Sequence, residues 1–323
     1  MSRKIFFAFV MIALLLAACA SPRVEATPSA QPSSIPDTPT AEPTAAPITL
    51  TDGLNRTVTL PAAARTVVSL APSNTEILFA VGAGAQVVGR DLFSDYPPEA
   101  VSVQDIGGSM GEYNLEAIAS LKPDLVLAGG INPSDLVASL EKLGLTVYFL
   151  PNPTTLEEMF VNLETVGTLT GHEAEAAVLV ESLKARVEAV DQKVLPLSYA
   201  PTVYYEIDAT DPTKPYTYGP GSFGNLLIQR AGGINIGSEL KDPWAVISSE
   251  QLIAANPSIV LLGDAMWGET PDKFAARPGF DKLDAVKNNQ VFAFDDNLVS
   301  RPSPRLVDGL EALAKILHPD LFK

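Results

Sequence analysis

Apolar residues recur at close to helical spacing along residues 171–195, a stretch with no proline and no glycine after its first residue. The apolar positions are Ala176, Leu179, Val180, Leu183, Val187, Val190 and Val194. At the rise of an α-helix this stretch would span roughly 35 Å. Short β-rich runs alternate with helical patterns on both sides. Two interpretations stay open: the helix joins two α/β lobes that face a cleft, or it covers one large α/β domain.

Before this helix, the pattern predicts a buried strand over residues 67–71 and a short helix over residues 75–82. Pro72, Ser73 and Asn74 lie in the turn between them. Ligands of open α/β sheets bind beyond the carboxyl ends of the strands. These three residues are therefore candidates to line a binding site. The alternative is that Ser73 and Asn74 only cap the helix.

A rigid loop over residues 94–100 carries Tyr96. Pro97 and Pro98 exclude the interior of a strand or helix at this point. A ring held on a stiff loop loses little conformational entropy when it stacks on a ligand. The alternative is that Tyr96 folds back onto the core.

A repeated phrase links the two blocks: residues 114–127 and residues 249–261 each predict a short helix, a proline break and a buried strand. In both copies a glutamate in the first helical turn, Glu116 or Glu250, precedes the proline by seven residues. The matched pair indicates equivalent docking points, one in each half. The alternative is that each acid only complements its helix dipole.

The second block begins with a predicted strand over residues 202–207. A loop rich in glycine and proline follows over residues 216–222, and a further loop carries Trp244. A polar loop over residues 295–304 precedes a C-terminal helix over residues 304–317.

The N-terminus has the pattern of an export signal. Arg3 and Lys4 precede an apolar run over residues 5–18, which is too short for a comfortable transmembrane helix. The run ends in the letters LAAC, which resemble a bacterial lipobox with Cys19 as the lipidated residue. The alternative is a plain secretory signal with a chance cysteine. Residues 20–47, rich in proline, serine and threonine, predict a disordered tether.

Composition excludes several functions. The 323 residues carry a formal net charge of −16, so binding to nucleic acid is not expected. The single cysteine permits no intramolecular disulfide, and the two histidines, His172 and His318, cannot build a His-rich metal site. No P-loop and no arrangement of serine, histidine and aspartate is visible, so no catalytic residues are predicted and an exported enzyme is the weaker interpretation.

Together, six motifs in order resemble the cluster-A (class III) periplasmic binding proteins, which are substrate-binding components of importers for cobalamin, ferric siderophores and haem. They are the lipobox, VVSLAPSNTEILFAVG, SDYPPEA, NLEAIASLKPDLVLAGG, PWAVISSEQLIAANPSIVLL and RPSPR. The resemblance implies an α/β fold of two Rossmann-like lobes joined by a single long rigid helix. It assigns residues 1–19 to the signal peptide and lipobox, 20–47 to the tether, 48–170 to the N-terminal lobe, 171–195 to the inter-lobe helix and 196–323 to the C-terminal lobe.

The resemblance also implies the partners and the location. A monomer anchored to the cell membrane through lipid on Cys19 would face the outside of the cell and bind a small molecule, a corrinoid or a ferric chelate. It would deliver that ligand to an ABC permease dimer powered by an ATPase. No cofactor of the protein's own is implied, because the ligand would itself carry cobalt or iron.

Within the family, the SDYPP loop and the tryptophan before the second repeat most resemble the cobalamin-binding branch. By that resemblance Glu116 and Glu250 are the permease-docking acids. Two tryptophans of that branch are replaced, one by Met110 with Tyr113 nearby and one by glycines at Gly129 and Gly130. The ligand therefore stays open between cobalamin, another corrinoid, haem and a ferric siderophore. The candidate ligand-binding residues are Pro72, Ser73, Asn74, Tyr96, Met110, Tyr113, Gly130, Tyr205, Glu206, Tyr216, Tyr218, Trp244 and Arg301.

Overall fold

The computed structural model describes residues 46–108 and 112–323. The chain divides into two units, residues 1–44 and 45–323, and the second contains all of the described secondary structure. The predicted signal peptide, Cys19, nearly all of the predicted tether and Met110 lie outside the described residues.

The first lobe is built on a four-stranded parallel sheet in the order β4-β3-β5-β6. Its strands are fully buried apolar runs or nearly so, as expected when helices cover both faces of a parallel sheet. A separate antiparallel hairpin, β1-β2, precedes it. The elements are β1 (Ile48–Thr51), β2 (Thr57–Leu60), β3 (Val67–Ser69), α1 (Pro72–Ala80), β4 (Val87–Arg90), α2 (Leu115–Ser120), β5 (Leu125–Ala128), α3 (Ser134–Lys142), β6 (Val147–Phe149) and α4 (Leu156–Thr170).

The second lobe has a six-stranded mixed sheet in the order β10-β8-β7-β11-β12, with β9 also paired to β7. Strands β7, β9, β11 and β12 are parallel, whereas β8 runs antiparallel to both β7 and β10. The elements are β7 (Thr202–Asp208), β8 (Tyr216–Tyr218), α6 (Phe223–Arg230), β9 (Ile234–Asn235), β10 (Trp244–Val246), α7 (Ser249–Ala255), β11 (Ile259–Leu262), α8 (Pro271–Ala275), α9 (Asp284–Lys287), β12 (Val291–Ala293), α10 (Asn297–Ser300) and α11 (Arg305–Leu317).

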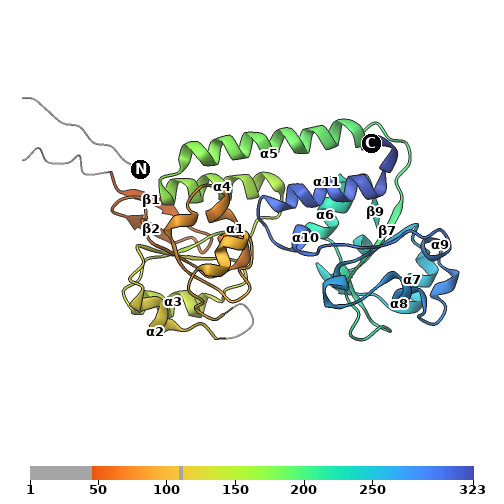
Figure 1. Ribbon diagram of the computed structural model, residues 1–323, viewed down its shortest axis with the longest axis horizontal. Helices are drawn as coiled ribbons and strands as arrows, with labels where there is room; N and C mark the ends of the chain where they lie inside the picture. The colour runs from red at the N-terminus through yellow and green to blue at the C-terminus, as the bar shows by residue number, and fades with distance from the viewer. Residues whose placement is uncertain (1–45, 109–111) are drawn as a thin grey trace, which may run out of the picture. The chain divides into compact units, whose positions relative to one another are not determined.

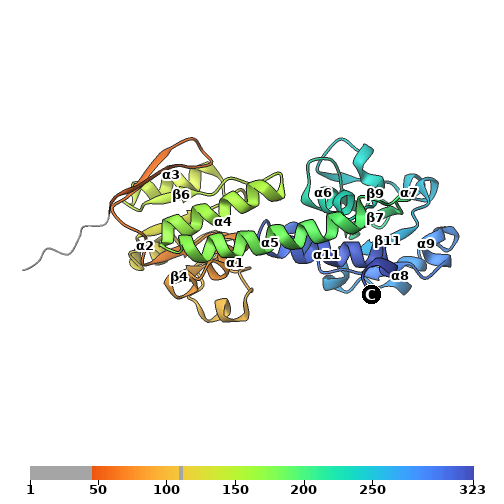
Figure 2. The same ribbon diagram turned by 90° about the horizontal axis from the view of Figure 1, so that it is seen from above.

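The long helix predicted over residues 171–195 is confirmed as α5 (Glu173–Val194). Gly171 ends α4 in the left-handed region, at φ 76°, where glycine is unstrained. Figure 1 and Figure 2 both show α5 lying along α4 at one end and along α11 at the other. Two separate sheets, one before α5 along the chain and one after it, agree with the two-lobe interpretation.

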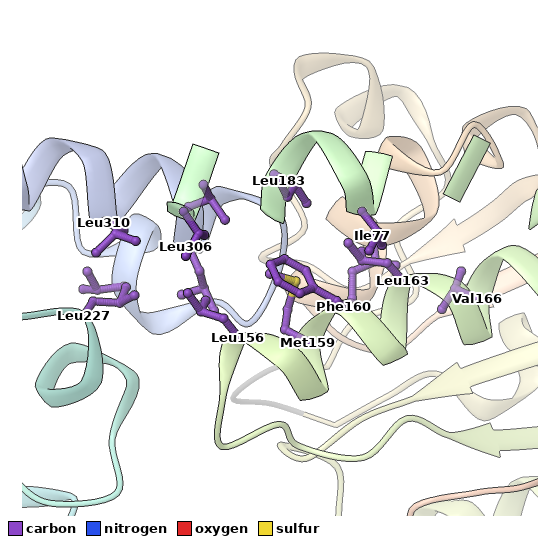
Figure 3. Packing of buried hydrophobic residues seen from close by; sticks show 14 of the residues in the cluster. Ile77, Leu156, Met159, Phe160, Leu163, Val166, Leu183, Leu227, Leu306 and Leu310 are labelled. Atoms are coloured by element: carbon purple, nitrogen blue, oxygen red, sulfur yellow. The ribbon is translucent and has the colours of Figure 1, made fainter. Parts of the chain in front are cut away.

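The two lobes share one hydrophobic cluster. It contains Ile77 of α1, Phe160 of α4, Leu183 of α5, Leu227 of α6 and Leu310 of α11. Figure 3 shows how Leu156 of α4 and Leu306 of α11 point toward each other within this cluster. Because close-packed interiors resist deformation, this shared cluster makes α5 part of a stiff support rather than a free linker.

Two segments predicted as loops are strands. Residues 216–218 form β8, and Trp244 opens β10. The two strands pair in register, with Trp244 opposite Tyr218 and Val246 opposite Tyr216. Their flanking prolines and glycines indicated a loop, but the alternation of Tyr, Thr and Tyr was the stronger signal.

Among residues 46–108 and 112–323, no helix combines the length and apolar character needed to cross a bilayer.

Candidate functional site

The predicted ligand residues of the first lobe lie just beyond β3 and β5. Pro72 and Ser73 open α1 and are half-buried. Asn74 is buried and its side-chain amide donates to the carbonyl of Leu127 at 3.1 Å. Asn74 therefore ties α1 to β5, and its role as a ligand contact stays a prediction.

Tyr113 and Gly130 lie near the same strand ends. The Tyr113 hydroxyl donates to the carbonyl of Leu70 at 2.7 Å and accepts from the side chain of Asn132 at 2.8 Å. The ring of Tyr113 is half-buried. Gly130 is exposed, and a Cβ there would approach the side chain of Asn152 at 2.8 Å. A larger residue at Gly130 would therefore push against Asn152.

Tyr96 is 42% exposed, so the alternative that it is buried in the core is wrong. The guanidinium of Arg305 lies 4.1 Å from the centre of its ring, a cation–π contact between the first lobe and α11. Tyr96 and Arg305 also line a cavity of about 330 Å³ with Phe79, Leu183 and Pro304.

In the second lobe, the structure brings Tyr216 and Trp244 together. Tyr216 is 46% exposed and Trp244 is 62% exposed. They lie on one face of the β8–β10 pair at diagonal positions, since Trp244 is opposite Tyr218 and Tyr216 is opposite Val246. Val246, also exposed, was not predicted, although a short strand alternating from Trp244 would place it on this face.

Three further candidate residues of the second lobe are buried, and their contact with a ligand stays a prediction. The rings of Tyr205 and Tyr218 are buried 4.9 Å apart, and both hydroxyls donate to Asp296 Oδ1, at 3.0 and 2.8 Å. Burial, followed by the nearby charge of Asp296, raises the pKa of both tyrosines, and burial also raises the pKa of Asp296. Glu206 is fully buried and bonded to Arg277. These three residues build the core of the lobe instead of its surface.

Arg301 belongs to a network that joins the two lobes through Glu76, a buried residue of α1 that was not predicted. The carboxylate of Glu76 accepts from Arg305 Nε at 3.0 Å, from Arg301 at 3.1 Å and from the hydroxyl of Ser303. A second contact from Arg305 makes that pair bidentate. Arg301 also pairs with Asp95 at 2.6 Å. Any ligand contact of Arg301 would have to share it with these carboxylates.

A second buried network lies inside the second lobe. Arg277 donates to both carboxylate oxygens of Glu206 at 2.6 Å and to Glu269 at 3.0 Å. The Tyr204 hydroxyl donates to Glu206 at 3.0 Å. Asp264, also buried, lies beside these carboxylates.

The two predicted docking acids occupy equivalent positions. Glu116 and Glu250 both lie in the first turn of a short helix, α2 or α7, and both are exposed. Neither forms an ion pair with a described residue. The Glu250 amide and the Ser248 side chain hold the pKa of Glu250 below its usual value, so this carboxylate is charged at neutral pH.

Within the described ranges, no group of three or more histidine, cysteine, aspartate or glutamate side chains could hold a metal ion. Each of the two histidines has its own local partner. His172 lies 3.8 Å from Glu175, and His318 lies 3.3 Å from the carbonyl of Gly232.

Two α/β lobes on one long helix, with exposed rings in both lobes, define a two-lobe solute-binding protein. The sequence model described as periplasmic binding protein matches residues 67–298, and the chain belongs to that family. It is the solute-binding component of an ABC transporter.

Particular relatives agree with this assignment. The chain is 30% identical to the uncharacterized ABC transporter substrate-binding lipoprotein YvrC of Bacillus subtilis, over 99% of this chain and 98% of the relative. Among solved structures, the periplasmic vitamin B12 binding protein BtuF of Vibrio cholerae has a TM-score of 0.69 at 27% identity, covering 81% of this chain and 100% of that one. The periplasmic heme-binding protein RhuT of Roseiflexus has a TM-score of 0.71 at 26% identity, covering 80% and 100%.

Proposed function

We propose that the protein binds a corrinoid between its lobes and releases it unchanged to a permease. The observation that carries this proposal is the exposed surface of Tyr216, Trp244 and Val246 on β8 and β10. Two large exposed rings on one face of a strand pair suit a broad, partly apolar macrocycle, because stacking supplies affinity while a few polar groups fix orientation. Tyr96 in the other lobe would supply a further ring, and likeness to the vitamin B12 binding protein supports the choice.

Haem or a ferric siderophore is the second candidate. The likeness to the heme-binding protein RhuT supports it, and so does exposed Gly130, where the cobalamin-binding branch has a tryptophan by the resemblance described above. The metal would arrive within the ligand, since no cofactor of the protein's own is proposed. Chemical turnover of the ligand is not part of the proposal.

The ligand is tested by titrating the protein with cyanocobalamin, cobinamide, haemin and a ferric siderophore. Trp244→Ala should weaken binding of the preferred ligand by about 2 kcal/mol, or roughly thirtyfold, because a tryptophan in the centre of a contact surface commonly contributes that much. The melting temperature should hardly change, since Trp244 is mostly exposed. Tyr199→Ala, at another exposed ring, is the control. Equal affinities of wild type and Trp244→Ala would exclude this surface.

Glu116 and Glu250 are proposed to dock on the permease. Changing both to arginine should leave ligand affinity unchanged in solution and abolish ligand uptake by cells, because like charges would then meet at the docking surface. The matched control reverses two exposed acids of α5, Glu173 and Glu188, and should retain uptake. Normal uptake by the Glu116/Glu250 double variant would refute the docking role.

The remaining proposals concern location. Lipid on Cys19 would anchor a monomer outside the cell, with residues 20–47 as a spacer to the membrane. Incorporation of labelled palmitate that survives Cys19→Ser would contradict the anchor.

A further inference from the structure

A polar pocket lies in the C-terminal lobe, and one of its residues, Asp208, is paired opposite Tyr216 of β8. Its volume is about 390 Å³. It is formed where β7 and β11 end, and its lining includes Asp208, Thr210, Asp264, Trp267, Glu269 and Lys273. None of these residues was predicted as a ligand contact. The pocket lies at the carboxyl ends of two parallel strands, the edge of an α/β sheet where ligands commonly bind.

Asp264 is the unusual residue of this pocket. It is only 7% exposed, and its Oδ1 atom accepts no hydrogen bond from any described residue. A buried carboxylate oxygen without a donor is costly, and nearly all such atoms in folded proteins have a partner. The Oδ1 atom itself is closed off from solvent, but the carboxylate lines the pocket, so something that enters the pocket would meet this group at its other oxygen.

The nearby cations are already occupied. Arg277 donates to both oxygens of Glu206 and to Glu269. The Lys273 ammonium donates to the carbonyl of Gly268 at 2.6 Å, at the edge of the pocket. One guanidinium thus faces three carboxylates, those of Glu206, Glu269 and Asp264. Burial, helped by the charges of Glu206 and Glu269, raises the pKa of Asp264 to about 7.

The pocket wall favours an organic cation. Trp267 is 76% exposed and lines the same pocket, and the face of an indole ring attracts a cation. The described residues offer no cluster of metal-binding side chains here. An organic cation that donates a hydrogen bond to the Asp264 carboxylate needs an N–H group, which a primary ammonium or a guanidinium carries and a quaternary ammonium lacks.

We propose that this pocket binds a small organic cation with N–H donors, held by Asp264 beneath it and by Trp267 at its side. The proposal goes beyond the corrinoid site and does not depend on it. The cation is either a separate solute or a substituent of the transported ligand, and both present the same chemistry to Asp264.

The test uses n-butylammonium as the probe, with 1-butanol as its neutral counterpart and tetramethylammonium as a cation without N–H groups. Fluorescence is followed in a Trp244→Phe background, where Trp267 is the remaining tryptophan of the chain. Butylammonium should change the emission saturably. The other two probes should bind at least about tenfold more weakly, because 1-butanol lacks the positive charge and tetramethylammonium lacks the N–H donor of a charge-assisted hydrogen bond. Equal binding of all three, or none by butylammonium, would overturn the proposal.

The pH dependence and two variants sharpen the test. Binding should strengthen by up to about tenfold per pH unit between pH 6 and 7, because the cation needs ionised Asp264. Asp264→Asn should weaken binding about tenfold and remove most of this dependence, whereas Asp281→Asn, at an exposed site of the same lobe, should change neither. Unchanged binding by Asp264→Asn would also refute the proposal.

Two sources of the cation are separated by competition. If butylammonium still binds to protein saturated with cyanocobalamin, the pocket serves a separate solute. If saturation displaces it, the pocket receives part of the transported ligand. Neither result touches the corrinoid proposal, which is judged by titration of Trp244→Ala.

Discussion

The protein contains two buried glutamate–arginine networks that look alike locally and differ in charge balance. Glu76 joins the lobes and meets two guanidiniums, those of Arg301 and Arg305, while Asp95 takes the outer side of Arg301. Glu206 lies within one lobe, and among the described residues it forms an ion pair with one guanidinium, that of Arg277. Both glutamates make a bidentate contact with their arginine.

The difference lies in the surrounding carboxylates. Around Glu76, the ion pairs join two carboxylates to two guanidiniums, and the Ser303 hydroxyl adds a neutral donor. The further carboxylate near Arg305, that of Asp295, is exposed to solvent. Around Glu206, the carboxylates of Asp264 and Glu269 share the single guanidinium. A balanced network of buried charges only has to hold its geometry. A network with more carboxylates than guanidiniums has to take up a proton or an external cation. Such an excess therefore marks a site that can respond to pH or to a bound cation.

The largest expected effect comes from removing the only cation of the unbalanced network. Arg277→Met should lower the free energy of unfolding by about 3–5 kcal/mol at pH 7, because Glu206 would be left buried without a countercharge. Urea unfolding measures this loss. Arg65→Met, at an exposed arginine, is the control and should cost little. A loss below about 1 kcal/mol for Arg277→Met would mean that Glu206 does not depend on Arg277 as its countercharge.

A smaller effect is expected in the balanced network. Glu76→Gln keeps the size of the side chain and one acceptor oxygen. It should lower the free energy of unfolding by about 2 kcal/mol, mainly because the hydrogen bonds from Arg301 and Arg305 would no longer go to a charged acceptor. Glu141→Gln is the matched control, because Glu141 pairs with Arg56 at the surface and should cost under about 1 kcal/mol. Equal losses in the two variants would contradict the importance of the buried contact between lobes.

The smallest effect for a single step of one pH unit is a change of slope with pH. Folding raises the pKa of Asp264 from its usual value of 3.8 to about 7, so between about pH 4 and 7 the folded state holds a proton that the unfolded state lacks. The stability from this group is present at the low end of that range and is lost as pH rises through it. Relative to Asp264→Asn, the wild type should therefore lose about 1 kcal/mol per pH unit across the range.

Urea unfolding of both proteins at pH 5, 6, 7 and 8 gives this comparison. Using the difference between the two proteins cancels the other titrating groups. Asp281→Asn should follow the wild type. Parallel curves for wild type and Asp264→Asn would show that Asp264 titrates alike in the folded and unfolded chain.

Much of the fold could be predicted because local patterns carry it. The spacing of apolar residues over 171–195 predicted α5. The repeated phrase predicted α2 with β5 in the first lobe and α7 with β11 in the second. Exposure in the candidate site was harder to predict. Tyr205 and Glu206 are adjacent in β7, yet both are buried, because the second lobe covers both faces of that central strand.

The partners of buried charges could not be predicted at all. Glu76 and Arg305 are 229 residues apart, and no periodicity connects them. A glutamate inside the apolar run of residues 75–81 was the only hint, since an acid in such a run needs a countercharge once it is buried. The unpaired oxygen of Asp264 likewise depends on loops that meet only in the folded lobe.

The hydrophobic cluster common to α1, α4, α5, α6 and α11 has a consequence for how the molecule comes apart. Neither half contains a complete hydrophobic core. A chain cut after residue 195 would therefore leave each fragment with an exposed apolar surface. Calorimetry of residues 46–323 should accordingly record one cooperative melting peak instead of two, and the separated halves should aggregate unless they are refolded together.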